Sequence, residues 1–321
     1  MTSLRNYKLD NLKALLIVLV VFGHLLEPYR NQSFFLFLYI IIYSFHMPLF
    51  IIITGYFHKD SRSLKKLIYI YFLYNSFYWL FDLTLGGEKF SSNTISSYLL
   101  IPNWIMWYLL SLILWTLISR LTKKIPLVSP LVVFLSIIIQ FLPFNFYILS
   151  IGRTISFFPF FYIGQYLKEN SNIREVKLSK AYIIPLLLFL LLFYINILEV
   201  ITVSLLYRSH SLLTLYGSLN ISHFVLLALI FINALAWSLF IYIVIPKVPT
   251  RWTYLGQTTM PIYLEHAAWV LIIQSVLDKY IVDKINTFTL LALLVLCTIL
   301  ITLMLSKISV YKYLEQRGIL K

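Results

Sequence analysis

Long apolar runs separated by short polar segments dominate the pattern of the chain. Residues 181–198 and 285–306, for example, contain no charged side chain. A helix needs about 20 apolar residues to cross ~30 Å of hydrocarbon. The pattern predicts an all-α, polytopic integral-membrane helical bundle of about ten transmembrane helices. Their expected positions are near residues 12–28, 34–57, 65–85, 104–118, 126–143, 154–167, 180–200, 221–245, 258–277 and 287–306.

Composition supports this fold class. Hydrophobic residues make up 60% of the chain and charged residues 12%, against roughly 25% charged in soluble domains. No linker or shift in composition marks a boundary, so we expect residues 1–321 to form one transmembrane domain. No small-residue cleavage site follows the first apolar run, which we expect to be retained as a span. The single cysteine, Cys297, excludes an internal disulfide.

The basic residues predict the orientation of the bundle. Of the 26 Lys and Arg residues, 20 fall on one side of the predicted membrane. Because cytoplasmic loops are enriched in basic residues, both termini are expected in the cytoplasm. The net charge of +14 then reflects topology, and we expect no nucleic-acid partner. The six on the other side are Arg30, Lys89, Arg153, Arg208, Lys279 and Lys284.

Three predicted spans carry ionisable residues where lipid would make them costly. His24 lies within LLIVLVVFGHLLEPYR, His46 within the second span, and Glu265 and His266 within YLEHAAW of the ninth. We expect these spans to bring imidazoles and a carboxylate to the middle of the bundle. His24 is then a catalytic base, a proton-relay group or a hydrogen-bonded packing residue.

Glu27 follows His24 by three residues, so the two side chains share a helix face. A carboxylate there could orient the imidazole and stabilise its charged form, which would make His24 a competent base. The alternative is that Glu27 ends the span before Pro28 and faces water.

The segment HKDSRSLKKL places Arg62, Lys65 and Lys66 at the entry to the third span. Positions three and four residues apart share a helical face, and three cations on one face suit a phosphorylated ligand. The alternative is that they are ordinary basic flanks of a cytoplasmic segment.

On the opposite side, Arg153 stands against the charge bias and needs either an anionic partner or water reached by snorkelling. Trp107 and Tyr108 belong to an aromatic-rich segment that could hold a sugar or form a membrane girdle. Asp10, just before the first span, is expected to be a helix N-cap. The sequence contains no Gly-rich phosphate loop, HExxH or GxSxG motif, and we expect no metal.

Six blocks in order resemble the acyltransferase 3 family of integral-membrane acyltransferases, which includes O-acetyltransferases of bacterial surface polysaccharides. They are RNYKLDNLKALLIVLVVFGH, SFHMPLFIIITGYF, SLKKLIYIYFLYN, WYLLSLILW, RTISFFPFFYIGQYLK and TYLGQTTMPIYLEH. The third block lacks the family's usual proline before the tyrosine. The family's arginine pair is here Arg62 with Lys65 and Lys66.

The resemblance implies transfer of an acetyl group from acetyl-CoA to a hydroxyl of an extracellular or lipid-linked polysaccharide. His24 matches the family's essential histidine, and the basic motif matches its donor site. The implied setting is the plasma membrane of a bacterium, with membrane lipid, acyl-CoA and a cell-surface polysaccharide or its lipid-linked precursor as partners. His46, Arg153, Trp107, Tyr108, Glu265 and His266 are the expected substrate-binding or supporting residues.

A second function class fits the same intramembrane polar residues. A polysaccharide exporter or a proton-coupled transporter would use His24, Glu27, His46 and His266 as relays. Such transporters often contain paired, broken repeats, and the sequence shows no convincing repeat.

Overall fold

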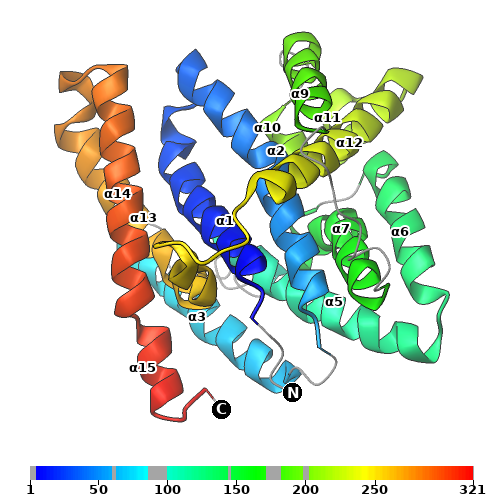
Figure 1. Cartoon of the computed structure of the whole chain (residues 1–321), viewed down its shortest axis with the longest axis horizontal. Helices are drawn as coiled ribbons and strands as arrows, with labels where there is room; N and C mark the ends of the chain where they lie inside the picture. Colours follow the sequence, from blue (N-terminus) through cyan, green and yellow to red (C-terminus); the bar gives the residue numbers. More distant parts are fainter. Residues whose placement is uncertain are drawn as a thin grey trace. The chain divides into compact units, whose positions relative to one another are not determined.

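A computed structural model of the chain describes residues 5–59, 63–85, 100–143, 146–170, 182–197 and 202–320 (Figure 1). Within these ranges every regular element is a helix. The elements are α1 (Tyr7–Leu26), η1 (Glu27–Tyr29), α2 (Ser33–Tyr56), α3 (Leu64–Leu85), η2 (Trp104–Met106), α5 (Trp107–Lys124), α6 (Val128–Ile138), η3 (Ile139–Phe141), η4 (Ile148–Ser150), α7 (Ile151–Glu169), α9 (Ile183–Ile197), α10 (Val203–Tyr207), α11 (Leu212–Tyr216), α12 (Ile221–Val244), η6 (Thr253–Gln257), α13 (Thr259–Tyr280), η7 (Val282–Lys284), α14 (Thr287–Lys307) and α15 (Val310–Gln316). A helix therefore occupies each of the ten predicted positions.

Several helices have the length and apolar surface of membrane spans. Among the described residues, six are long and apolar enough to cross a membrane. They are Tyr7–Tyr29, Ser33–Tyr56, Trp104–Lys124, Ile221–Val244, Thr259–Tyr280 and Thr287–Gln316. On α14 the side chains of Phe288 and Leu300 are 77% and 56% exposed, as expected for a face against lipid. The protein is a multi-pass helical membrane protein, as predicted.

The chain divides into two compact units. Unit 1 comprises Met1–Phe50, Ser179–Leu186 and Trp237–Lys321, and unit 2 comprises Ile51–Leu178 and Leu187–Ala236. The boundaries after residues 50, 186 and 236 fall inside α2, α9 and α12 respectively.

In unit 1, α1 is the central helix. It packs against η6, α13 and α14, and α13 packs against α14 (Figure 1). Leu12, Leu16, Ile17 and Leu25 of α1 are almost completely buried. Burying an aliphatic side chain of this size contributes about 1.5–3 kcal/mol in water, whereas in lipid the close packing of side chains drives association.

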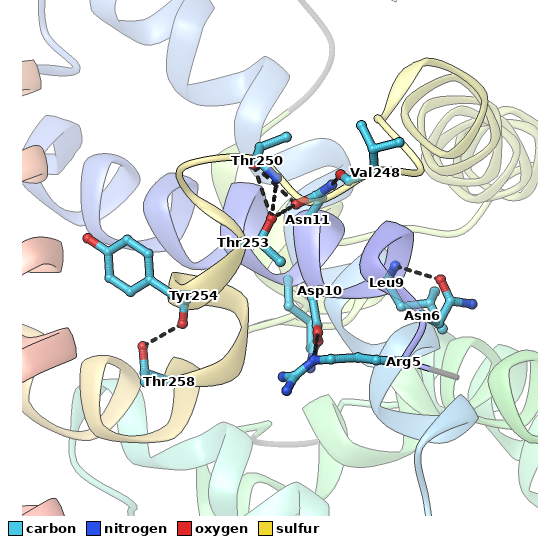
Figure 2. Close-up of polar contacts among 11 residues, drawn as sticks. Arg5, Asn6, Leu9, Asp10, Asn11, Val248, Thr250, Thr253, Tyr254 and Thr258 are labelled. Carbon is cyan, nitrogen blue, oxygen red and sulfur yellow. Dashed lines mark hydrogen bonds and ion pairs between the residues drawn. The ribbon is translucent and has the colours of Figure 1, made fainter. Parts of the chain in front are cut away.

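The first turn of α1 differs from the prediction for Asp10. The N-cap is Asn6, whose side-chain oxygen accepts a hydrogen bond from the backbone amide of Leu9 at 3.3 Å (Figure 2). Asp10 lies inside the helix and forms ion pairs with Arg5 at 2.7 Å and Lys13 at 2.8 Å. A carboxylate in the first turn is favourable because of the helix dipole, so Asp10 serves the helix start by charge and not as its cap.

Asn11 fixes α1 to the segment that precedes η6 (Figure 2). Its amide nitrogen donates hydrogen bonds to the carbonyls of Pro246 and Val248, both at 2.9 Å. Its amide oxygen accepts from the hydroxyls of Thr253 at 2.6 Å and Thr250 at 3.2 Å. Both ends of this buried amide are thus satisfied, which removes the penalty for burying it.

In unit 2, polar side chains and small residues join α2, α5 and α7. Ser111 of α5 lies 2.7 Å from the hydroxyl of Thr154 of α7, whose carbonyl accepts from the Trp115 indole at 2.9 Å. Gly55 and Gly164 let α2 and α7 cross closely, since a Cβ at either would lie about 2 Å from a backbone carbonyl of the other helix. The carbonyls are those of Phe161 and Ile52 respectively.

Asn11→Ala is expected to destabilise unit 1, because the carbonyls of Pro246 and Val248 lose their donor. Leaving buried polar groups unsatisfied costs about 1–3 kcal/mol. Thermal unfolding in detergent should show a melting temperature several degrees lower, whereas Gln316→Ala, an exposed control, should leave it unchanged. Equal melting temperatures for Asn11→Ala and wild type would contradict this role.

Candidate functional site

His24 and His266 lie side by side in unit 1. Their ring centroids are 5.3 Å apart, with 31° between the ring planes. His24 occupies the last turn of α1, and His266 lies one third of the way along α13 and is fully buried. The expectation that the first and ninth spans bring their imidazoles together is confirmed.

Tyr43 of α2 connects His46 to this pair. Its ring lies edge-on to His46 at 4.5 Å and to His24 at 6.4 Å, and its hydroxyl is 3.4 Å from Nδ1 of His24. Tyr39 stacks on Tyr43 at 4.0 Å. Gly23 makes room for this arrangement, since a Cβ there would come within 2.9 Å of the Tyr43 ring. His46 therefore adjoins the His24–His266 pair through an intervening tyrosine.

Backbone contacts fix the tautomer of two of the three imidazoles. Nδ1 of His266 lies 3.0 Å from the carbonyl oxygen of Ile262 and 2.9 Å from that of Tyr263. Nδ1 of His46 lies 2.8 Å from the carbonyl oxygen of Ile42. Because a carbonyl only accepts, each Nδ1 carries a hydrogen, and in the neutral ring each Nε2 then has the lone pair. Nε2 of His266 is buried and has no hydrogen-bond partner among the described residues.

Glu27 faces His24, as its spacing predicts. Its Oε2 lies 3.5 Å from Nδ1 of His24, and its Oε1 lies 3.8 Å from Nη2 of Arg30. Arg30 also donates to the Glu27 carbonyl at 2.7 Å and lies over the ring of Tyr39. The chain changes from α-helix to 3-10 helix at Glu27 because Pro28 has no amide hydrogen to continue the α-helix.

One face of α13 holds the end of α1 in place. Gln274 donates from its side chain to the carbonyl of His24 at 2.7 Å, and Asp278 accepts from the Tyr29 hydroxyl at 2.8 Å. His266, Val270, Gln274 and Asp278 recur every four residues and so lie on the same side of α13. The helix that carries His266 therefore also positions the backbone of His24.

The side chain of Glu265 points away from that of His266, toward the start of α15. Its carboxylate accepts hydrogen bonds from the backbone amides of Tyr311 at 2.8 Å and Val310 at 3.2 Å. Successive residues of an α-helix point about 100° apart, so His266 faces α1 while Glu265 faces α15. The carboxylate satisfies amides at the start of α15 that have no partner within that helix.

The basic segment is described only in part. Arg62 lies outside the described residues, whereas Lys65 and Lys66 occupy the first turn of α3. The Ser63 hydroxyl caps this helix by accepting from the Lys66 amide at 3.2 Å. Lys168, near the end of α7, donates to the His58 carbonyl. Two lysines at a helix N-terminus, where amide hydrogens point outward, form a surface that attracts anions.

The three remaining candidates belong to unit 2. The guanidinium carbon of Arg153 lies 4.9 Å from the Tyr147 ring and 5.5 Å from the Trp107 ring, so these aromatic faces hold it by cation–π interactions. The ring of Trp107 stacks on Phe157. Tyr108 is buried, and its hydroxyl lies 2.6 Å from that of Thr54.

Sequence reasoning missed Tyr43 and Gln274. The tyrosine is one of 24 in the chain, and only its placement three residues before His46 could have drawn notice. Gln274 is an amide in an otherwise apolar stretch, a signal that was present. Among the described residues, no group of three or more His, Cys, Asp or Glu side chains could hold a metal ion.

Replacing Glu265 tests whether its carboxylate holds α15 in place. In Glu265→Ala the first amides of α15 lose their acceptor, so this helix should detach more easily. Limited trypsin digestion after Lys312 or Arg317 should become several-fold faster, whereas Asp283→Ala, an exposed acidic control, should behave as wild type. Unchanged digestion would show that the carboxylate does not hold α15.

Comparisons with known proteins identify the family. The model of the acyltransferase domain that defines the acyltransferase 3 family matches residues 6–307. Nodulation protein NolL of Sinorhizobium fredii (strain NBRC 101917 / NGR234) is 30% identical over 197 residues, which cover 52% of this chain and 51% of that protein. The match thus spans about half the length of this curated relative. No solved structure matches. Because the family match extends over most of the chain, the protein belongs to the acyltransferase 3 family.

Proposed function

We propose that the protein is an O-acyltransferase of a bacterial plasma membrane. It moves an acetyl group from acetyl-CoA on the cytoplasmic side to a hydroxyl of a cell-surface polysaccharide or of its lipid-linked precursor. The observation that carries this proposal is the close pair formed by His24 and the buried His266, with Glu27 against the first ring. In an acyltransferase, such a pair offers the proton acceptor that attack by a hydroxyl requires.

His24 acts as the general base in this reaction. With its Nδ1 hydrogen directed at Glu27, its Nε2 lone pair takes the proton of the acceptor hydroxyl as the oxygen attacks the thioester carbonyl. The new C–O bond replaces the C–S bond, and His24 then returns the proton to the departing sulfur. A positioned base of this kind is typically worth about 10²–10⁴-fold in rate.

Two features stabilise the positive charge that His24 acquires. The ring lies in the last turn of α1, where the helix dipole favours a cation. The Glu27 carboxylate is 3.5 Å from Nδ1, and catalytic hydrogen bonds of this length commonly shorten when substrate binds. Arg30 holds the other oxygen of that carboxylate.

His266 acts through His24. Its Nδ1 is committed to two carbonyls, so its buried Nε2 can only accept a hydrogen bond. A group fixed in this way is suited to accept from the protonated His24 ring or from the hydroxyl beside it. We therefore regard His266 as a positioning residue for the proton transfer.

The donor's phosphates have a suitable site in unit 2. Lys65 and Lys66 lie at the N-terminus of α3, with Lys168 bound to the His58 carbonyl just before the segment that contains Arg62. Helix N-termini and lysine ammonium groups both favour phosphate. These are the groups that we propose bind acetyl-CoA.

A proton-coupled transporter or polysaccharide exporter is the second candidate, because the three imidazoles could relay protons. The tautomers argue against a relay, since the Nδ1 atoms of His46 and His266 donate to backbone carbonyls of their own helices. A proton arriving at either Nε2 has no side chain to which Nδ1 could pass it on.

His24→Ala should lower O-acylation of the host's surface glycan by about 10²–10⁴-fold, because the base is lost. The measurement is the amount of acyl group released from that glycan by mild alkali, in wild type, a deletion strain and the variant at matched membrane levels. Glycan export should be unchanged. Loss of surface glycan with acylation intact would identify an exporter and contradict the enzyme assignment.

Two substitutions at His266 separate the contribution of its Nδ1 from that of its Nε2. Asn can imitate Nδ1 but has nothing at the position of Nε2, whereas Gln reaches the position of Nε2. His266→Asn should lower kcat about 10²-fold with little change in KM for acetyl-CoA, and His266→Gln should retain several-fold more activity. If both variants lose activity equally while folding normally, the Nε2 lone pair has no special part in the reaction.

A further inference from the structure

Arg208 is a buried cation with no side-chain partner among the described residues. It follows α10 and is 5% exposed, and its side chain forms no hydrogen bond or ion pair with any residue that the structure describes. Burial lowers the pKa of its guanidinium to about 10, which leaves it charged at neutral pH. Arginine is rarely buried without a counterion, because removing its charge from water is costly. No described residue therefore supplies an anion to this guanidinium.

The backbone around Arg208 is held in an unfavourable conformation. Arg208 has φ 51° and ψ 41°, in the left-handed region that side chains disfavour. Leu149 and Ser150, in a second connection of unit 2, also have positive φ values of 48° and 50°. Strained residues of this kind persist where surrounding structure enforces them, commonly at ligand sites.

Contacts link these two connections to each other. The Ser209 hydroxyl lies 3.1 Å from Nδ1 of His210, and the His210 ring meets the Tyr147 ring edge-on at 5.6 Å. Tyr147 in turn lies under the guanidinium of Arg153, beside Trp107. We define the Arg208 cluster as Trp107, Tyr147, Arg153, Arg208, Ser209 and His210.

No described carboxylate of unit 2 forms an ion pair with Arg208. Within the described part of unit 2 the carboxylates are Asp82 and Glu169. Asp82 accepts a hydrogen bond from the Asn103 side chain. Glu169 is exposed at the end of α7. Arg153 and Arg208 are also two of the six basic residues on the side predicted to be outside, where topology does not require them.

We propose that the Arg208 cluster binds an anionic group, a carboxylate or a phosphate, on the glycan acceptor. This inference rests on the proposed function, since it names the chemistry of that acceptor. Arg208 and Arg153 hold the anion, because a guanidinium binds either group through two parallel hydrogen bonds. The exposed Tyr147 ring supplies a flat apolar surface against which a sugar packs. A uronic-acid residue of the glycan would provide a carboxylate, and a lipid-linked precursor a phosphate.

Binding of three small sugars to the purified protein in nanodiscs tests the proposal. The probes are methyl glucuronide, glucose 1-phosphate and the neutral methyl glucoside, with affinities measured by ligand-observed NMR. For the wild type, at least one anionic sugar should bind tenfold or more tightly than methyl glucoside, and the tighter one identifies the anion's source. Arg208→Gln should remove this preference, Arg208→Lys should weaken it, and Lys284→Gln, which removes an exposed charge elsewhere, should retain it.

The alternative is that Arg208 pairs with Glu199, which lies outside the described residues. Arg208→Met distinguishes the two cases through thermal unfolding. An unpartnered charge is relieved by this change, so the melting temperature should rise or stay constant. A lower melting temperature that Glu199→Gln restores would reveal a structural ion pair and overturn the proposal.

The same preparations separate this inference from the proposed function. Transfer of label from radiolabelled acetyl-CoA to the host glycan is measured alongside sugar binding. Anion preference without any acyl transfer would refute the proposed function while supporting the site. Acyl transfer by a wild-type protein that shows no anion preference would refute the site alone.

Discussion

Gln274 donates a hydrogen bond to the backbone carbonyl of His24, and the geometry of the imidazole pair depends on that contact. Two turns earlier on the same face of α13, His266 lies beside the His24 ring, and one turn later Asp278 holds Tyr29. Because helix association in lipid relies on packing and hydrogen bonds between helices, these contacts determine how α1 and α13 are aligned along their axes. A shift of one helix past the other would separate the two rings.

The chemistry follows from how each imidazole is constrained. His46 and His266 have their Nδ1 hydrogens bound to carbonyls within their own helices, so in the neutral ring of each, Nε2 is the acceptor. His24 differs, since its Nδ1 faces the Glu27 carboxylate and the Tyr43 hydroxyl. Only His24 combines a helix C-terminus with a nearby carboxylate, the two features that stabilise a protonated ring. The arrangement therefore assigns the change of charge to one residue of the three.

Much of this fold could be predicted from the sequence, whereas the direction in which individual side chains point could not. Apolar runs located the helices, and costly histidines at membrane depth identified His24 and His266. Glu265 was expected beside them but caps α15. In a helix that is apolar on all sides, lipid and protein interior accept the same residues, so periodicity does not show which face is inward. Asp10 was predicted to be the N-cap, but the N-cap is Asn6. The reason is that the helix begins about one turn before its apolar run.

The most direct measurement is a double-mutant cycle between His24 and His266. It follows the transfer of label from radiolabelled acetyl-CoA to glycan in membrane vesicles, for wild type, His24→Ala, His266→Asn and the double variant. Residues that serve one proton transfer are strongly non-additive. The double variant should therefore be no slower than His24→Ala alone. If the two losses multiply, the imidazoles act independently and the paired site described here is wrong.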